Sequence, residues 1–155
     1  MTNLKIACIA AFNEERKIGD VVNRTKKFVD HVVVCDDGSD DNTGKEATLA
    51  GAFVIKHEKN LGKGKAMKTL FEYAKSIKAD VVVTIDGDGQ FLPEEIPTLI
   101  TPIVSGTVDV VIGYRFENNE EMPKYRKIGN KIFDKFTNLA SDLPFRDTQS
   151  GFRAY

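Results

Sequence analysis

The chain has 155 residues, with 22 Lys and Arg against 23 Asp and Glu, so its formal net charge is −1. This length suits one domain with a sizeable core. The near-zero charge excludes a uniformly basic surface and argues against nucleic acid as the main partner. The longest apolar run, residues 6–12, falls far short of the roughly 20 residues of a membrane helix, and no signal peptide is visible. We therefore expect a cytoplasmic location.

Short runs rich in β-branched residues alternate along the chain with longer segments of helical spacing. The predicted strands are residues 4–10, 31–36, 52–56, 81–86 and 109–113. The predicted helices are residues 15–28, 43–50, 64–77 and 93–104. Pro97 and Pro102 predict that the last of these helices is short, kinked or broken. Beyond them, apolar residues every three or four positions predict a helix over 125–139, and residues 147–155 are expected to form a loop leading into a strand.

Continuous apolar strands such as residues 81–85 are typical of a parallel sheet covered by helices on both faces. We therefore predict an α/β fold with a mostly parallel sheet. Ligands of such sheets bind beyond the carboxyl ends of the strands. The polar residues at the ends of the predicted strands are Asn13 and Glu14, Asp36 and Asp37, Asp86 to Asp88, and Tyr114 and Arg115. This edge of the sheet is the candidate site.

The segment Asp86-Gly87-Asp88-Gly89-Gln90 follows a buried strand with two carboxylates two residues apart. Such a pair needs a cation or hydrogen-bond donors, and Mg²⁺ or Mn²⁺ held together with ligand phosphates would satisfy it. A solvated turn is the alternative. A calcium EF-hand loop is excluded because Phe91 and Pro97 stand where it needs Gly and Glu. A phosphatase of the haloacid dehalogenase type is disfavoured because it carries its D-x-D on the first strand.

Two further segments carry candidate chemistry. Asp36 and Asp37 end a strand, where a carboxylate could accept a hydrogen bond from a nucleobase, whereas Asp40, Asp41 and Thr43 are interpreted as turn and cap residues. In residues 57–65, glycines and lysines suit a phosphate, but the spacing matches neither a P-loop nor a Rossmann fingerprint, and a solvated loop fits equally well. His57 is predicted to be a surface residue because no second His lies at metal-binding spacing.

Together these motifs resemble the catalytic domain of family 2 glycosyltransferases with the GT-A fold, the group that includes dolichyl-phosphate mannose synthase. The resemblance depends on five segments in the family's order: residues 10–15, 36–39, 60–64, 86–90 and 150–153. It covers essentially the whole chain. It implies a Rossmann-like GT-A domain with a nucleotide-binding part in residues 1–90 and an acceptor-side part in residues 91–155.

The resemblance also implies roles for individual residues. Those expected to bind the donor are Ala10, Phe12, Asn13, Glu14, Asp36, Asp37, Lys65, Asp86, Gly87, Asp88 and Arg115. Within this set Phe12 packs near the base, Glu14 reaches the ribose and Asp37 meets the base. The expected metal ligands are Asp86, Asp88 and Gln90, and the expected catalytic residues are Asp88, Arg115 and Asp147. Ala10 departs from the family's usual proline, and Tyr114 from its usual serine.

The implied reaction is an inverting transfer from a GDP-mannose, UDP-glucose or UDP-N-acetylglucosamine type of donor, with Mg²⁺ or Mn²⁺. The acceptor is expected to be a polyprenyl or dolichyl phosphate, or else a glycan, for which Asp147 would be the general base. A lipid acceptor would bring the domain into peripheral contact with the cytoplasmic face of the membrane. Because the family continues beyond the motif at residues 150–153, we expect a truncated catalytic domain. The oligomeric state is left open.

Two alternatives remain at this point. One is an inactive fragment of a glycosyltransferase that binds nucleotide-sugars without turning them over. The other is a receiver-type signalling domain, which is also a parallel α/β fold with an acidic cluster. A receiver would carry its phosphorylated Asp on the third strand, whereas the third predicted strand here ends in Lys56.

Overall fold

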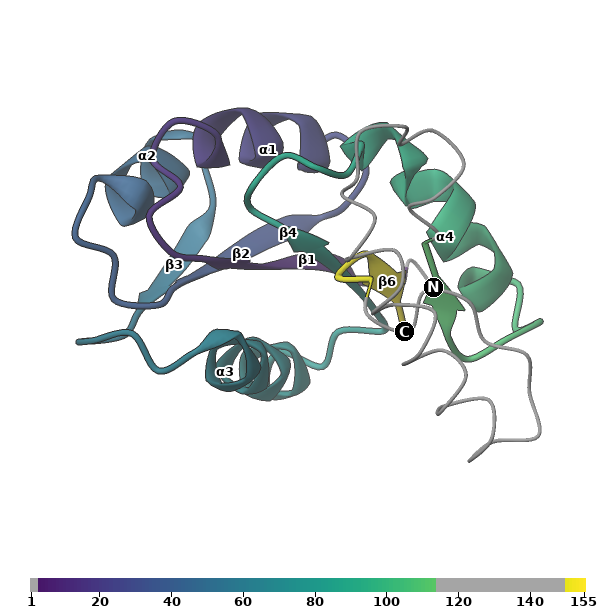
Figure 1. Cartoon of the computed structure of the whole chain (residues 1–155). Helices are drawn as coiled ribbons and strands as arrows, with labels where there is room; N and C mark the ends of the chain where they lie inside the picture. The colour runs from purple at the N-terminus through teal and green to yellow at the C-terminus, as the bar shows by residue number, and fades with distance from the viewer. Residues whose placement is uncertain (1–2, 114–149) are drawn as a thin grey trace, which may run out of the picture.

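A six-stranded sheet forms the centre of the computed structural model, which describes residues 3–113 and 150–155 (Figure 1). The strands are β1 (Lys5–Ala11), β2 (His31–Asp36), β3 (Phe53–Lys56), β4 (Val81–Asp86), β5 (Val111–Ile112) and β6 (Arg153–Ala154). They lie in the order β3-β2-β1-β4-β6-β5. The pairs among β1 to β4 are parallel, whereas β6 runs antiparallel to both of its neighbours. The predicted α/β fold with a mostly parallel sheet is confirmed.

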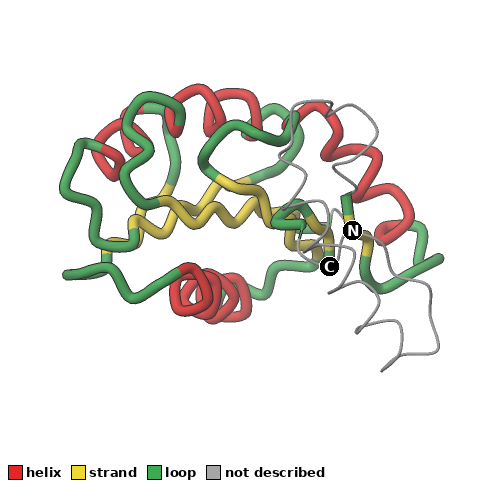
Figure 2. The backbone as a smooth tube through the Cα atoms, in the orientation of Figure 1, coloured by secondary structure: helices red, strands yellow, loops and turns green. Residues whose placement is uncertain are grey.

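Helices cover both faces of this sheet, as Figures 1 and 2 show. The helical elements are α1 (Ile18–Thr25), α2 (Thr43–Leu49), α3 (Lys63–Ser76), the 3₁₀ turn η1 (Pro93–Glu95) and α4 (Ile96–Val104). Successive strand residues point to opposite faces, so Ile9 packs in the cluster beneath α1, α2 and α4, while Cys8 packs beneath α3. Because both faces are buried, the strands are apolar on both sides.

The predicted elements match the observed ones within a few residues at their ends. The largest difference is the first helix, predicted over 15–28, which begins at Ile18 and ends at Thr25. The last predicted helix, over 93–104, consists of η1 followed by α4. Pro97 stands in the first turn of α4, where its missing N–H is not needed, and Pro102 lies inside the helix. The helix predicted over 125–139 lies outside the described residues. No helix among those that are described is long and apolar enough to cross a membrane.

The chain reverses its direction of winding between β1 and β4. From β1 the connections pass through α1 and α2 to β2 and β3 on one side, and α3 then returns across the other face to β4. In open sheets of this kind the crevice for a ligand lies at the carboxyl ends of the strands flanking such a reversal. Those ends are Ala11 and Asp86, and the end of the neighbouring β2, Asp36, lies beside them through the pairs Ala11↔Asp36 and Ala10↔Asp86.

Residues 150–155 complete the sheet beside β4. Val82 and Tyr155 exchange backbone hydrogen bonds, and Thr84 pairs with Arg153. Because β6 is antiparallel, its start lies opposite the carboxyl end of β4. The Ser150-Gly151 segment is therefore brought to the same edge as Asp86.

Candidate functional site

The loops that follow β1 and β2 are tied together by hydrogen bonds. The Asn13 backbone N–H donates to Ser39 Oγ at 3.0 Å, and the Asp40 N–H donates to Asn13 Oδ1 at 3.0 Å. Asn13 has φ = 56°, a left-handed conformation that Asn tolerates better than most residues. The side chain of Asn13 thus holds the β2 loop in place, and Phe12 beside it is 40% exposed.

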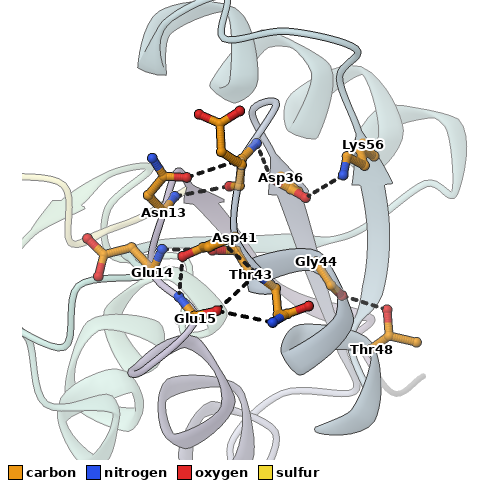
Figure 3. A network of polar contacts seen from close by, with 12 residues as sticks. Asn13, Glu14, Glu15, Asp36, Asp41, Thr43, Gly44, Thr48 and Lys56 are labelled. Atoms are coloured by element: carbon orange, nitrogen blue, oxygen red, sulfur yellow. Dashed lines mark hydrogen bonds and ion pairs between the residues drawn. The ribbon is translucent and has the colours of Figure 1, made fainter.

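Thr43, at the start of α2, is the centre of a second network (Figure 3). The Glu14 N–H donates to Thr43 Oγ1 at 2.7 Å, and the Thr43 N–H donates to Asp41 Oδ1 at 2.9 Å. Burial alone would raise the pKa of Asp41, but the hydrogen bonds from Thr43 and the Glu15 N–H hold it below its usual value. Asp41 and Thr43 thus support the turn before α2, as interpreted, but the N-cap is Asn42, whose side chain makes no capping hydrogen bond.

The carboxylate of Glu14 points away from this network (Figure 3). Its pKa is raised by partial burial first, and then by the negative charges of Asp88 and Asp41, against the opposing effect of Lys17. Asp88 is thus near enough to Glu14 for the two charges to act on each other across the loops after β1 and β4. A ligand that brought positive charge or N–H donors there would relieve this repulsion.

Asp36 ends β2 as a fully buried carboxylate. Its Oδ1 accepts a hydrogen bond from the Ser39 N–H at 2.9 Å, and Lys56 Nζ lies 3.7 Å from Oδ2. Within the described part of the chain, Oδ2 has no hydrogen-bond partner. A Cβ at Gly44 would lie 2.7 Å from that oxygen, so glycine is needed where α2 passes Asp36. These contacts support the turn after β2.

Asp37 lies beside Asp36 and is held by the loop that precedes α3. His57 Nδ1 is 2.6 Å from Asp37 Oδ1, and the backbone N–H groups of Leu61 and Gly62 donate to the same carboxylate at 3.1 and 2.8 Å. Burial alone would raise the pKa of Asp37, but these hydrogen bonds outweigh it and lower the pKa below its ordinary value. His57 is therefore not the surface residue that its isolation in the sequence predicted, since its side chain is only 11% exposed.

Asp86 is where three distant parts of the chain meet. It ends β4, its Oδ1 lies 2.5 Å from Lys63 Nζ at the start of α3, and the backbone of Gly151 passes close to both of its oxygens. A Cβ at Gly151 would overlap this carboxylate, so no other residue fits there without displacing Asp86. Gly87 is constrained in a different way, because a Cβ there would lie 3.2 Å from Ile18 and 3.3 Å from Ala11. Lys63 and Gly151 also line an open pocket of about 420 Å³.

Asp88 and Gln90 lie beyond Asp86 in a tight turn. The Gln90 backbone N–H donates to Asp88 Oδ1 at 3.0 Å, and Gly89 takes φ = 71°, which favours glycine. Carboxylate and amide oxygens are the ligands that Mg²⁺ and Mn²⁺ prefer, so the residues present fit such a cation. The described residues contain no cluster of three or more His, Cys, Asp or Glu side chains that could hold a metal, so oxygens from a ligand would have to complete the coordination.

The remaining predicted site residues are distributed unevenly. Ala10 pairs with both Cys35 and Asp86 in the sheet, at the centre of the edge. Lys65 is exposed on α3, and the lysine that reaches Asp86 is Lys63. Arg115 and Asp147 lie outside the described residues. Lys63 and His57 were not among the predicted site residues. The Gly-Lys-Gly pattern at residues 62–64 was a sequence signal for Lys63, whereas no sequence signal indicated His57.

The fold and this edge of the sheet define a GT-A type of α/β domain, the class of nucleotide-diphospho-sugar transferases. One solved structure of the class is glucosyl-3-phosphoglycerate synthase from Mycobacterium tuberculosis in complex with Mn²⁺ and UDP-glucose, which superposes with a TM-score of 0.70. It is 26% identical in sequence, and the match covers 98% of this chain and 55% of that one.

The profile of Glycosyl transferase family 2 matches residues 6–155, and the chain belongs to this family. A UDP-N-acetylglucosamine–dolichyl-phosphate N-acetylglucosaminyltransferase of Methanococcus voltae is 36% identical over 95% of this chain and 67% of its own length. A dolichyl-phosphate hexose transferase of Haloferax volcanii is 36% identical over 95% of this chain and 64% of its own length. The chain thus spans about two thirds of these relatives and about half of the solved structure. The family resemblance is confirmed, and the receiver-type alternative is wrong.

Proposed function

We propose that this domain transfers a sugar from a nucleotide-diphospho-sugar to a polyprenyl or dolichyl phosphate, with inversion at the anomeric carbon. The observation that carries the proposal is the meeting at Asp86 of the end of β4, Lys63 and the backbone of Gly151. It supports one site shared by a donor's diphosphate and an acceptor. The acceptor class is supported by the names of the two archaeal relatives.

The nucleoside is proposed to lie over the carboxyl ends of β1 and β2, within residues 1–90. Ala10, Phe12, Asn13 and Glu14 would line its path, and Asp36 and Asp37 would form its floor. The exposed ring of Phe12 supports a packing role toward a base, and the Glu14 carboxylate, which points away from the Thr43 network, supports a contact with a ribose hydroxyl. Residues 91–155 are proposed to form the acceptor side.

The chemistry proposed for this edge is stabilisation of a leaving group. When the bond between the anomeric carbon and the phosphate oxygen breaks, its electron pair stays on the nucleoside diphosphate, which gains negative charge. Lys63 and Arg115 are cations suited to meet that charge as it develops. Asp86, Asp88 and Gln90 would hold Mg²⁺ or Mn²⁺, which when bound supplies further electrostatic stabilisation of the diphosphate.

The acceptor decides whether a base is required. A lipid phosphate is already an anion, so its oxygen can attack the anomeric carbon from the face opposite the leaving group without losing a proton. A glycan hydroxyl would have to transfer its proton, and Asp147 is the proposed base for that case. The lipid phosphate therefore makes fewer demands on the site.

The experiment is a transfer assay on the 155-residue chain with Mn²⁺ and a short-chain polyprenyl phosphate. Radiolabelled UDP-N-acetylglucosamine, UDP-glucose and GDP-mannose are supplied separately, and sugar in the organic phase is counted. We expect one donor to give lipid-linked sugar. In calorimetry, the nucleoside diphosphate of that donor, UDP or GDP, should bind more tightly than the other of these two. Nucleotide binding without transfer would support a binding fragment instead, and the absence of both would refute the proposal.

A further inference from the structure

We infer that His57 is a positioning residue that fixes the start of α3, and with it Lys63, through the buried carboxylate of Asp37; its effect on donor binding rests on the proposed function. His57 follows β3 directly, and its backbone N–H donates to the Asp36 carbonyl at 2.9 Å. Its side chain lies between the end of β2 and the inner side of α3. No ligand contact is required for this role.

Both nitrogens of the His57 ring have partners. Nδ1 lies 2.6 Å from Asp37 Oδ1, and Nε2 lies 3.0 Å from Thr69 Oγ1, one turn and a half into α3. Since Asp37 is an ionised acceptor, Nδ1 carries the hydrogen of this bond. In the neutral ring Nε2 then accepts from the Thr69 hydroxyl, and the two contacts together fix the orientation of the ring at both ends.

Cys35 adds a third contact to the ring. Its Sγ lies 3.6 Å from His57 Nε2. Burial first, and then the charges of Asp37 and Asp36, raise the pKa of this thiol to about 11, so the sulfur keeps its hydrogen and can donate weakly to Nε2. The ring is therefore surrounded by an acceptor on one side and donors on the other, which suits the Nδ1–H tautomer.

The carboxylate that His57 holds is also the anchor of the loop before α3. Leu61 and Gly62 donate their backbone N–H groups to Asp37, and Gly62, with φ = 89°, is the residue at which the chain turns into the helix. Lys63 comes next and reaches Asp86. A continuous path of contacts thus leads from His57 through Asp37 and Gly62 to the lysine beside the D-x-D segment.

Loss of the His57 ring would leave the Asp37 carboxylate buried with two donors in place of three. The carboxylate would then be free to rotate, the Leu61 N–H would lose its fixed acceptor, and the Gly62 N–H would keep only Asn60 Oδ1, at 3.0 Å, as a local acceptor. The consequence would be felt at Lys63, on the phosphate side of the site, although His57 itself lies on the side of β2 and β3. This remote effect distinguishes a positioning residue from one that merely fills space.

A double-mutant cycle tests this path. We expect His57→Ala and Lys63→Ala each to weaken Mn²⁺-dependent binding of the preferred nucleoside diphosphate about tenfold, and the double variant to be little weaker than either single variant, because coupled residues are not additive. His57→Asn, which retains a donor toward Asp37, should recover most of the affinity. Lys68→Ala is the control, because it removes an equal charge from an exposed position of α3, where Lys68 pairs with Glu72. Any change in affinity caused by Lys68→Ala should simply add to the change caused by His57→Ala. Additive losses for His57 and Lys63 would overturn the inference.

A second measurement needs no nucleotide. Hydrogen exchange at the Leu61 and Gly62 amides should be at least tenfold faster in His57→Ala than in the parent chain, while amides in the middle of β1 keep their protection. Unchanged exchange at residues 61 and 62 would overturn the inference even if the parent binds donor. If the parent binds no nucleoside diphosphate, the proposed function fails, and faster exchange would still support the anchoring role of His57.

Discussion

Two parts of the candidate site differ in how far hydrogen bonds within the protein satisfy their carboxylates. The loops after β1 and β2 are closed by their own hydrogen bonds, which use the carboxylates of Asp36, Asp37 and Asp41. Among the residues that the structure describes, the turn after β4 has fewer ties, since Asp88 accepts one hydrogen bond within its own turn and Asp86 meets the end of the Lys63 side chain. Apart from Asp36 Oδ2, the carboxylates of the first part are held by protein donors, whereas those of the second part have few such partners among the described residues.

This difference indicates which carboxylates of the site serve stability and which are suited to ligand binding. Carboxylates whose partners are protein N–H groups stabilise the loops, so their removal should weaken the fold. Carboxylates without such partners contribute little to the fold and suit a role toward a cation or phosphate-bearing ligand. Substitutions in the two parts should therefore affect different measurements.

The largest loss of stability is expected at Gly38. This residue has φ = 72°, and an added Cβ would lie 2.3 Å from the Lys59 backbone, so the β2 loop and the loop before α3 would be forced apart. We expect Gly38→Ala to lower the free energy of unfolding by about 3 kcal/mol, measured by urea denaturation. Gly64→Ala is the control, because no atom of the described residues lies within 4 Å of its Cβ position and alanine favours a helix. Equal stability of the two variants would contradict the close packing of these loops.

A smaller loss is expected from Asp37→Asn, which places an amide N–H₂ among three donors. We expect a cost of about 2 kcal/mol at pH 7. Because the folded pKa of Asp37 lies below its ordinary value, its stabilisation is present above the unfolded pKa of about 3.9 and is lost as the pH falls through the folded pKa. The difference between parent and variant in urea denaturation should therefore shrink below about pH 4. Asp40→Asn, at an exposed position in the same loop, is the control and should change the free energy of unfolding at pH 7 by less than about 0.5 kcal/mol.

The smallest change in stability is expected at Asp88. Asn can still accept the hydrogen bond from the Gln90 N–H, so Asp88→Asn should change the free energy of unfolding by less than about 0.5 kcal/mol. Mn²⁺-dependent affinity for a nucleoside diphosphate should nevertheless fall about tenfold or more, measured by calorimetry. Affinity measured in a chelator should be the same for parent and variant. A metal-dependent affinity that survives the substitution would remove Asp88 from the proposed metal site.

The sequence predicted the parallel core and the edge at which the candidate site lies, because buried strands such as β4 are continuously apolar and end in polar residues. Ends of short elements were less predictable, since α1 owes its start at Ile18 to packing against the sheet rather than to a cap side chain. The partners of Asp37 and Asp86 could not be predicted in the same way. His57 and Lys63 reach them across 20 and 23 residues of sequence, because the pairing of β3 with β2 places His57 beside Asp37 and the start of α3 brings Lys63 to Asp86.

The insertion of β6 between β4 and β5 has a consequence for the order of folding. Among the described strands, β5 pairs only with β6, and the hydrogen bond from Thr84 Oγ1 to the Gly151 carbonyl closes a loop of 67 residues. Contacts so distant in sequence form late, because the entropy of closing the loop is lost before any contact is gained. The pairing of β1 with β4 joins residues 76 apart in sequence, so both contacts made by β4 belong to the late stage of folding. A refolding chain should regain its helical signal before it regains this edge of the sheet.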